Sequence, residues 1–220
     1  MNAGLDGAVS ALRAQFAQFA RFTQDTRLLQ LTTPLGADAL LVECIDGSEG
    51  LSEGFRFVIT VLSTDARVDA QRLLGQPALS QILTQRGRTA LRPLHGHMTV
   101  VEAVSADGGF ARYRLTLEPW LSFLRHRRDS YVWQGKSVPD IVQDIFSDYR
   151  EQGALAPAWR LDLADPRQYP PREVCTQFEE SDLAFVERLL GRGRLVLLVR
   201  ASGRPGRRHA GRPHAGDRRP

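Results

Sequence analysis

The sequence predicts an α+β protein that is mainly β, with a small β-barrel followed by an α/β segment. Short strand-like runs, separated by turn residues, fill residues 26–118 and are typical of a small barrel or sandwich. A strongly amphipathic helix is predicted at residues 137–149, because the apolar residues there recur at helical spacing. The last thirty residues are rich in Arg and Gly, and apolar periodicity ends after Val199.

The chain begins with a predicted leader, residues 1–25, that contains a helix at 7–22. Apolar side chains recur there at helical spacing, with Asp6 as a candidate cap: Val9, Leu12, Phe16, Phe19 and Phe22. The barrel that follows is expected to comprise six strands, at 27–33, 39–46, 55–62, 79–85, 94–104 and 110–118. A turn is expected at Gly47–Gly54, and one or two helical turns at residues 69–74.

The run at 55–62 is apolar on both faces. Phe55, Phe57, Ile59 and Val61 fall on one face and Val58 and Leu62 on the other. One face can enter the barrel core, and the other needs a partner. We therefore predict that residues 1–190 are not a stable soluble monomer in isolation.

The α/β segment, residues 119–190, is organised around the helix at 137–149. Its apolar residues form one stripe, with Ser137 at the N-cap and Asp140 three positions later. A short helix is expected at 119–124, and strands are expected near 131–133, at 159–163 and at 174–178. Ser181 is placed to cap a final helix, in which Leu183, Val186 and Leu190 share a face.

Charge is distributed unevenly along the chain, which has a net charge of +4. Residues 191–220 hold nine arginines and one aspartate, so this segment carries +8 and residues 1–190 carry −4. Such a segment cannot bury enough surface to offset its ordering entropy, and we expect it to be a disordered tail. The basic balance therefore describes the tail and does not indicate a basic face on the fold.

The sequence shows no secretory signal peptide, no disulfide framework and no membrane-spanning segment. Cys44 and Cys175 lie far apart in sequence and are expected to be free buried thiols. We find no basic, apolar signal segment at the N-terminus and no apolar run of the roughly 20 residues that a membrane span needs.

Three clusters were weighed as sites, and none is assigned. His95 and His97 could be metal ligands, but no further ligand stands near them, which favours a solvated turn. The basic turn Arg125–Arg128 could contact phosphate, but it lacks interleaved aromatic residues. Glu179 and Glu180 are better explained by favourable charge at the start of the last helix. We therefore expect no catalytic residue, no cofactor and no metal, and thus no enzyme.

Three runs of the sequence resemble the N-terminal part of VgrG proteins, the spike components of type VI secretion systems, also called Rhs-element Vgr proteins. They occupy residues 28–63, 112–146 and 175–190, the last reading CTQFEESDLAFVERLL. The resemblance implies a fold like the baseplate hub of contractile phages, with 26–118 as the first hub-like barrel. It also implies a structural role as a homotrimer that caps the Hcp tube, assembled in the cytoplasm and secreted. Effectors ride on intact relatives.

The resemblance covers residues 25–190, so we expect a truncated VgrG with a segment 191–220 that is read out of frame. Relatives often continue after the last helix as Ala-Glu-Glu-Gly-Leu-Phe-Tyr-Trp-Phe-Glu-His. One base inserted before suitable codons for that run changes its translation to Gly191 to Ala201 of this chain. The alternative is a genuine arginine-rich arm, which would make the chain a nucleic-acid-binding protein acting through its basic C-terminal tail.

Overall fold

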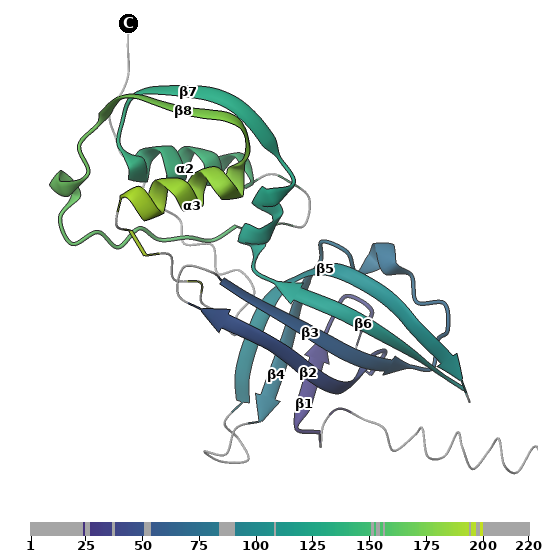
Figure 1. Ribbon diagram of the computed structural model, residues 1–220. Coiled ribbons are helices and arrows are strands. Elements are labelled where there is room, and N and C mark those ends of the chain that lie inside the picture. The colour runs from purple at the N-terminus through teal and green to yellow at the C-terminus, as the bar shows by residue number, and fades with distance from the viewer. Residues whose placement is uncertain are drawn as a thin grey trace, which may run out of the picture.

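The computed structural model describes residues 24, 27–36, 38–50, 54–83, 91–107, 109–150, 152, 155, 157–193, 195–196 and 199. Within these residues the fold has two parts, a curled six-stranded sheet and a smaller α/β part above it in the view of Figure 1. The predicted helix at 7–22 and most of the predicted tail lie outside the described residues.

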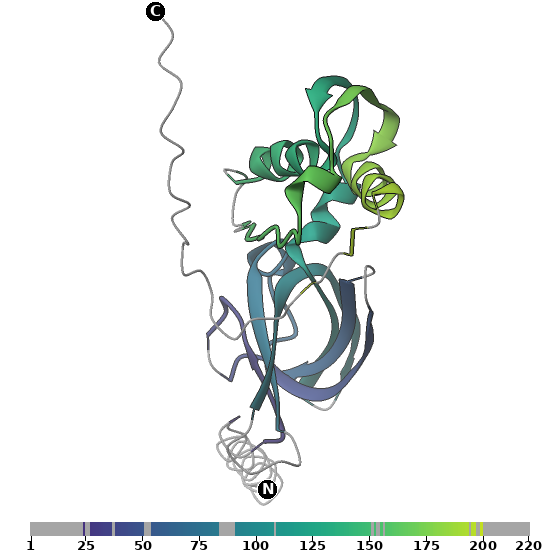
Figure 2. The ribbon, with the colours of Figure 1, turned by 90° about the vertical axis from the view of Figure 1, so that its left-hand side faces the viewer.

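The larger part is an antiparallel sheet that curls into a partly closed barrel (Figure 2). Its strand order is β1-β4-β5-β6-β3-β2. The strands are β1 (Leu29–Thr32), β2 (Leu41–Gly50), β3 (Gly54–Ser63), β4 (Pro77–Leu83), β5 (Leu91–Asp107) and β6 (Phe110–Glu118). Alternate residues of β3 and β6, such as Ile59, Leu115 and Leu117, are fully buried and form the centre of the core. The predicted mainly β fold is confirmed.

The seam between the edge strands β1 and β2 is closed by a side chain. The Gln24 amide donates to the carbonyls of Leu31 (3.2 Å) and Leu40 (3.1 Å), and its oxygen accepts the Leu31 N–H at 2.6 Å. Gln24 is only 8% exposed. One carboxamide therefore makes the bonds that a backbone ladder would otherwise supply, and Arg27 adds a bond to the Val42 carbonyl.

The smaller part is a two-stranded ribbon covered on one face by two helices. The ribbon pairs β7 (Arg128–Lys136) with β8 (Arg172–Ser181), and the helices are α2 (Val138–Asp148) and α3 (Asp182–Arg192). Helix α2 begins as predicted, with a capping box between Ser137 and Asp140. Its apolar stripe is buried with Trp133 and Phe185 in a second core.

The chain passes between the two parts twice. The first passage is η3 (Trp120–Arg125), the predicted short helix, which is a 3-10 helix. After α3, Leu195 packs against the second core and Val199 packs against the barrel core. The α/β part is therefore held between two segments that both contact the barrel.

Several boundaries differ from the sequence-based expectations. Strand β2 continues to Gly50 through the predicted turn, because Gly47 permits close approach to β3: a Cβ there would lie 2.3 Å from the Arg56 carbonyl oxygen. Residues 159–163 form no strand, because the two-stranded sheet pairs only β7 with β8. Helix α3 runs to Arg192, two residues into the predicted disordered tail, because its last turn is capped by Gly193.

The seam predicts a measurable loss of stability in Gln24→Leu. This variant keeps the size of the side chain but leaves two carbonyls and one N–H without their buried partner, at about 1–3 kcal/mol for a group left unsatisfied. We expect the free energy of unfolding in urea to fall by about 2 kcal/mol or more. Gln71→Leu, at an exposed position, is the control and should change little. Equal free energies of unfolding for Gln24→Leu and Gln71→Leu would contradict the stabilising role of Gln24 at the seam.

Candidate assembly interface

The outer face of the β7–β8 ribbon carries apolar side chains that no described element covers. Trp133, Cys175 and Gln177 point to the helices and are buried. Val132, Val174 and Phe178 alternate with them and are 50%, 55% and 71% exposed. We call these three residues the ribbon face. With Tyr131 beside it, the ribbon supplies four of the nine large apolar residues that are exposed in the described part, so the exposure is concentrated here.

A bulge in β8 sets the direction of the side chains around Phe178. Phe178 and Glu179 together stand opposite Ser130, and Glu179 has a positive φ of 47°. The Glu179 N–H donates to Ser130 Oγ at 3.1 Å. The extra residue shifts the alternation by one, so Glu180 turns toward α3 and pairs with Arg188, while Phe178 stays on the outer face.

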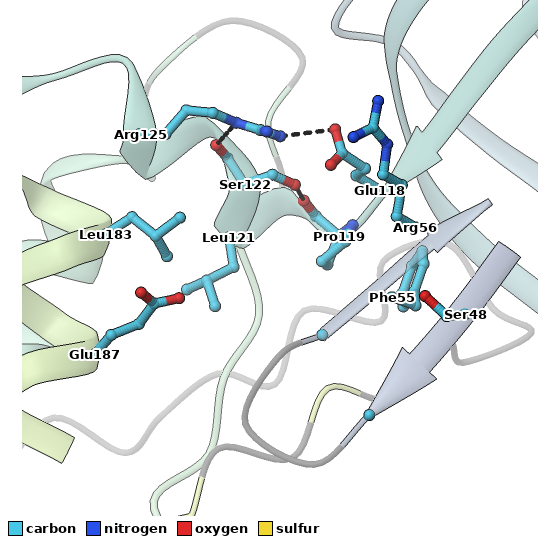
Figure 3. A pocket seen from close by; sticks show the side chains of 12 residues that line it. Ser48, Phe55, Arg56, Glu118, Pro119, Leu121, Ser122, Arg125, Leu183 and Glu187 are labelled. Carbon is cyan, nitrogen blue, oxygen red and sulfur yellow. Dashed lines mark hydrogen bonds and ion pairs between the residues drawn. The ribbon is translucent and has the colours of Figure 1, made fainter. Parts of the chain in front are cut away.

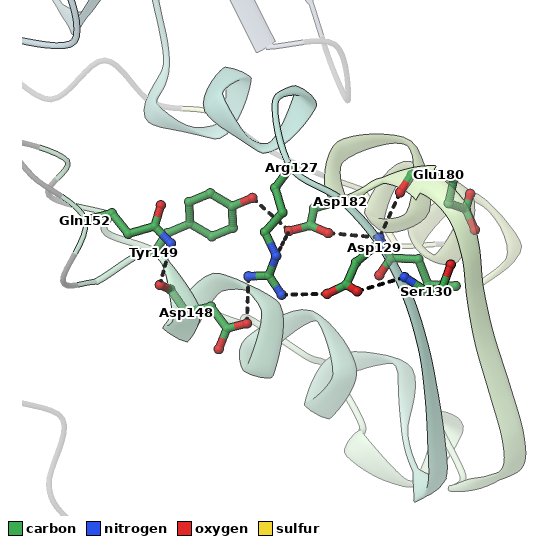
Figure 4. A network of polar contacts seen from close by, with 9 residues as sticks. Arg127, Asp129, Ser130, Asp148, Tyr149, Gln152, Glu180 and Asp182 are labelled. Carbon is green, nitrogen blue, oxygen red and sulfur yellow. Dashed lines mark hydrogen bonds and ion pairs between the residues drawn. The ribbon is translucent and has the colours of Figure 1, made fainter.

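A buried carboxylate supports the ribbon from behind (Figure 4). Asp182, at the start of α3, is 1% exposed. Its oxygens accept from Tyr149 Oη at 2.7 Å and Gln177 Nε2 at 2.9 Å, and Arg127 Nε lies 3.4 Å away. The carboxylate therefore joins the end of α2, the strand β8 and the start of β7 at one point.

Arg127 forms ion pairs with three acidic side chains. Its guanidinium bonds Asp148 at 2.8 Å and Asp129 at 3.0 Å in addition to its contact with Asp182. Burial opposes the charge of Arg127, but the bonds to Asp148 and Asp129 outweigh it and raise its pKa. Burial and the bond to Asp182 raise the pKa of Tyr149. These groups bond to one another within the fold, which indicates a structural role.

A groove of about 270 Å³ lies where the two parts meet (Figure 3). Phe55 and Arg56 line it from β3, Leu121 from η3, and Leu183 and Glu187 from α3. At its edge Arg125 bonds Glu118 at 2.6 Å and so ties η3 to the end of β6. The Ser122 hydroxyl, which also lines the groove, donates to the carbonyl oxygen of Pro119.

The two histidines lie in a strand and not in the predicted turn. His95 and His97 lie within β5 with His97 3% exposed, so the expected solvated turn is wrong. Apolar neighbours explain this, since the His97 ring meets Phe123 edge-on at 5.8 Å. Burial lowers the pKa of His95. No cluster of three metal-binding side chains occurs in the described part of the chain.

The basic turn is used within the fold. Arg125 and Arg127 bind acids as described above, and Arg128 donates to the Glu179 carbonyl. Each of the three arginines therefore has at least one acceptor within the protein. Glu180 has a specific partner in Arg188, which goes beyond the general favourable charge that the sequence suggested. Glu179 is the strained residue of the bulge.

Both cysteines are free, as expected, but only Cys175 is buried. Cys44 is exposed on the edge strand β2, where its thiol donates to Asp46. No helix within the described residues is long and apolar enough to cross a membrane.

Sequence reasoning missed Gln24, Gln177 and Asp182, which carry the two most connected polar arrangements. Asp182 follows the N-cap Ser181, in the first turn of α3, where the helix dipole stabilises an acidic side chain. Its presence there therefore needs no further explanation from the sequence. Its burial depends on Tyr149 and Arg127, which are distant in sequence, so no local signal distinguishes it.

The chain is similar in sequence to phage tail hub proteins and to type VI secretion spike proteins. A family profile described as "Phage tail baseplate hub (GPD)" matches residues 48–203, and so extends past residue 190, where we expected the likeness to end. The spike protein VgrG1b of Pseudomonas aeruginosa is 32% identical over 167 residues, which are 76% of this chain and 21% of that protein. VgrG4b of the same species is 39% identical over 145 residues, covering 65% of this chain and 16% of that protein.

Among solved structures, the Escherichia coli c3393 protein is similar with a TM-score of 0.58 and 30% identity, over 73% of this chain and 42% of that chain. It is described as a type VI secretion component with structural similarity to the T4 tail proteins gp27 and gp5. This chain therefore spans about a fifth of the length of the curated relatives. These comparisons give no support to the nucleic-acid-binding alternative.

The buried carboxylate predicts that Asp182→Asn destabilises the α/β part. The substitution removes the charge that faces Arg127 in a buried site, and we expect a loss of about 2 kcal/mol in urea unfolding. Asp162→Asn is the matched control, because its pair with Arg160 is more than four-fifths exposed on the Asp162 side. The control should cost under about 0.5 kcal/mol. A similar cost for both variants would contradict the proposed role of Asp182.

Tyr149 predicts a loss of stability at alkaline pH. Its pKa is raised in the folded state, so above the ordinary tyrosine pKa of about 10 the unfolded chain releases a proton that the folded chain retains. Stability is thus full below pH 10 and falls as pH rises, by at most about 1.4 kcal/mol per pH unit. Tyr149→Phe should show a shallower fall in the free energy of unfolding between pH 10 and 11. Parallel curves for the two proteins would refute this assignment.

Proposed function

The chain belongs to the phage tail baseplate hub family, and we propose that it is a structural subunit of a type VI secretion spike. The match over residues 48–203 carries this proposal. The relatives named as spike proteins are several times longer than this chain, so the role proposed here is that of the hub-like region they share with it.

We propose that residues 26–118 serve as the first hub-like barrel and residues 119–190 as an α/β unit carried on it. Three copies would form the ring that meets the Hcp tube and the baseplate, assembled in the cytoplasm and exported by the system in intact relatives. Two features support a role in assembly: the uncovered ribbon face, and the edge strand β2, which pairs only with β3 along its exposed residues.

The proposed role requires no chemistry. The most connected acids and bases, around Asp182 and Glu118, satisfy one another inside the fold. We therefore propose that the chain acts without catalysis, metal or cofactor.

The reading-frame hypothesis for residues 191–220 stays a prediction. DNA sequencing across codons 185 to 220 tests it, with the downstream sequence read one base over. If that frame does not encode the rest of a hub and spike, the hypothesis fails.

Self-association is the direct test of the proposed function. We expect sedimentation equilibrium of the purified full chain to give a trimer at micromolar concentration, because the exposed apolar face and the open edge need partners. Purified Hcp hexamer should co-sediment with this trimer. A monomer that stays monomeric at all concentrations and melts cooperatively would overturn the proposal.

A further inference from the structure

We propose that Phe178 of one copy of this chain inserts into the groove between the two parts of a second copy. This inference rests on the proposed self-association and names one of its contacts. Phe178 is 71% exposed, more than any other large apolar side chain in the described part of the chain. Such a side chain is expected to meet a partner surface, and the groove offers one of suitable size and chemistry.

The groove is large enough for an aromatic ring. Its volume is about 270 Å³, whereas an apolar cavity of about 150 Å³ already holds benzene. Phe55, Leu121 and Leu183 are its apolar lining residues. In Figure 3, Phe55 stands on the barrel side and Leu183 on the α3 side, with Leu121 between them. A ring that enters the groove therefore meets apolar side chains of β3, η3 and α3 together.

The charged side chains of the groove leave one cation and one anion for a partner. Arg125 and Glu118 pair with each other. Arg56 on β3 and Glu187 on α3 are exposed, and neither forms an ion pair with another residue that the structure describes. They lie on opposite walls of the groove (Figure 3). A fitting partner thus presents an apolar side chain between an acid and a base.

The bulge around Phe178 carries this combination. Glu179 follows Phe178 and is exposed. Arg128 donates from Nη2 to the Glu179 carbonyl oxygen at 2.5 Å, so its guanidinium lies beside the bulge. Within the described ranges, the side chains of Glu179 and Arg128 form no ion pair. With Phe178 in the groove, Glu179 pairs with Arg56 and Arg128 with Glu187, and these opposite charges set the orientation of the contact.

Phe178 cannot fill the groove of its own copy, because α3 stands between them. Phe178 lies on the side of the ribbon that faces away from the helices, whereas Trp133 on the inner side stacks on Phe185 of α3 with ring centroids 5.1 Å apart. Leu183 and Glu187 are each two residues from Phe185, so they lie on the opposite side of α3, where they line the groove. Figure 1 shows the ribbon above the helices and the barrel below them.

The contact joins two different surfaces, and each copy offers one of each. It is therefore head-to-tail, the type of contact that generates a ring when the rotation between neighbours closes. An aromatic side chain seated in a pocket is a common form of interface hot spot, so this small contact can carry a large share of the binding energy.

Charge exchange tests the pairing in the full chain, with self-association measured by sedimentation equilibrium. Arg56→Glu places a like charge opposite Glu179, and Glu179→Arg places one opposite Arg56. Each variant should associate on the order of tenfold more weakly than the parent chain. The variant that carries both changes restores an opposite pair and should associate nearly as well as the parent chain. Arg72→Glu, at another exposed arginine, is the control and should not restore association to Glu179→Arg.

Two results of this exchange would overturn the proposal. If the variant with both changes associates no better than Glu179→Arg alone, Arg56 and Glu179 do not meet. If Arg72→Glu restores association as well as Arg56→Glu does, net charge alone explains the effect. Each variant should unfold like the parent chain when monomeric, which separates a lost contact from a lost fold.

The contribution of the ring provides a second measurement. Phe178→Ser should weaken self-association by on the order of ten- to a hundredfold, because a large apolar side chain leaves the interface. Val104→Ser, which changes a 46% exposed residue on β5, is the control and should leave self-association unchanged. Equal effects of the two variants would contradict insertion of Phe178.

Photo-crosslinking locates the ring. A chain with p-benzoyl-phenylalanine at position 178 keeps an aromatic side chain there and is mixed with an excess of isotope-labelled parent chain. Under ultraviolet light we expect adducts on labelled peptides that contain Leu121 or Leu183. Adducts on the labelled ribbon, which would show that two ribbons meet, or adducts confined to the crosslinker's own chain would overturn the proposal. A trimer without groove adducts would refute this contact and leave the proposed function standing, whereas a parent chain that never associates would refute both.

Discussion

The α/β part depends on the need to neutralise one buried carboxylate. Asp182 is almost fully enclosed, and a charge in that position is tolerated only with partners that bond it. Arg127, Tyr149 and Gln177 supply them from three different elements. Satisfying Asp182 therefore fixes β7, α2, β8 and α3 relative to one another. The outer side chains of the ribbon are left with no role inside the unit, and that side of the ribbon is available to other molecules.

The elements that local patterns specify could be predicted from the sequence. The stripe of α2 and its capping box at Ser137 and Asp140 are complete within twelve residues, and β6 was correctly bounded by its alternation. Features that depend on distant residues could not be predicted in this way. Gln24 closes a seam with Leu31 and Leu40, and His97 is buried against Phe123, which belongs to another element. The absence of a strand at 159–163 has the same origin, since alternation cannot create a partner strand.

The ribbon face was likewise predictable only in part, because local patterns specify some of its features and distant residues specify the others. The alternation on β8 identifies which residues share a side of the ribbon, but not which side the helices cover. The bulge at Glu179 has no sequence signal either, because glutamate rarely adopts a positive φ. The two-sided apolar pattern of 55–62 correctly placed Ile59 and Val61 in the core. Val58 and Leu62 are partly covered by the neighbouring strands. Among the described residues, the exposed large apolar side chains are instead concentrated on the ribbon.

The seam has a consequence for local opening of the barrel. Every other strand pair is held by a ladder of backbone bonds, whereas β1 and β2 meet through the side chains of Gln24 and Arg27. Two rotatable side chains form a hinge with far fewer constraints than a ladder, so the barrel has its lowest free energy of opening there. Any contact that restrains Gln24 in this position therefore also favours the closed barrel, because closure and that contact are thermodynamically linked.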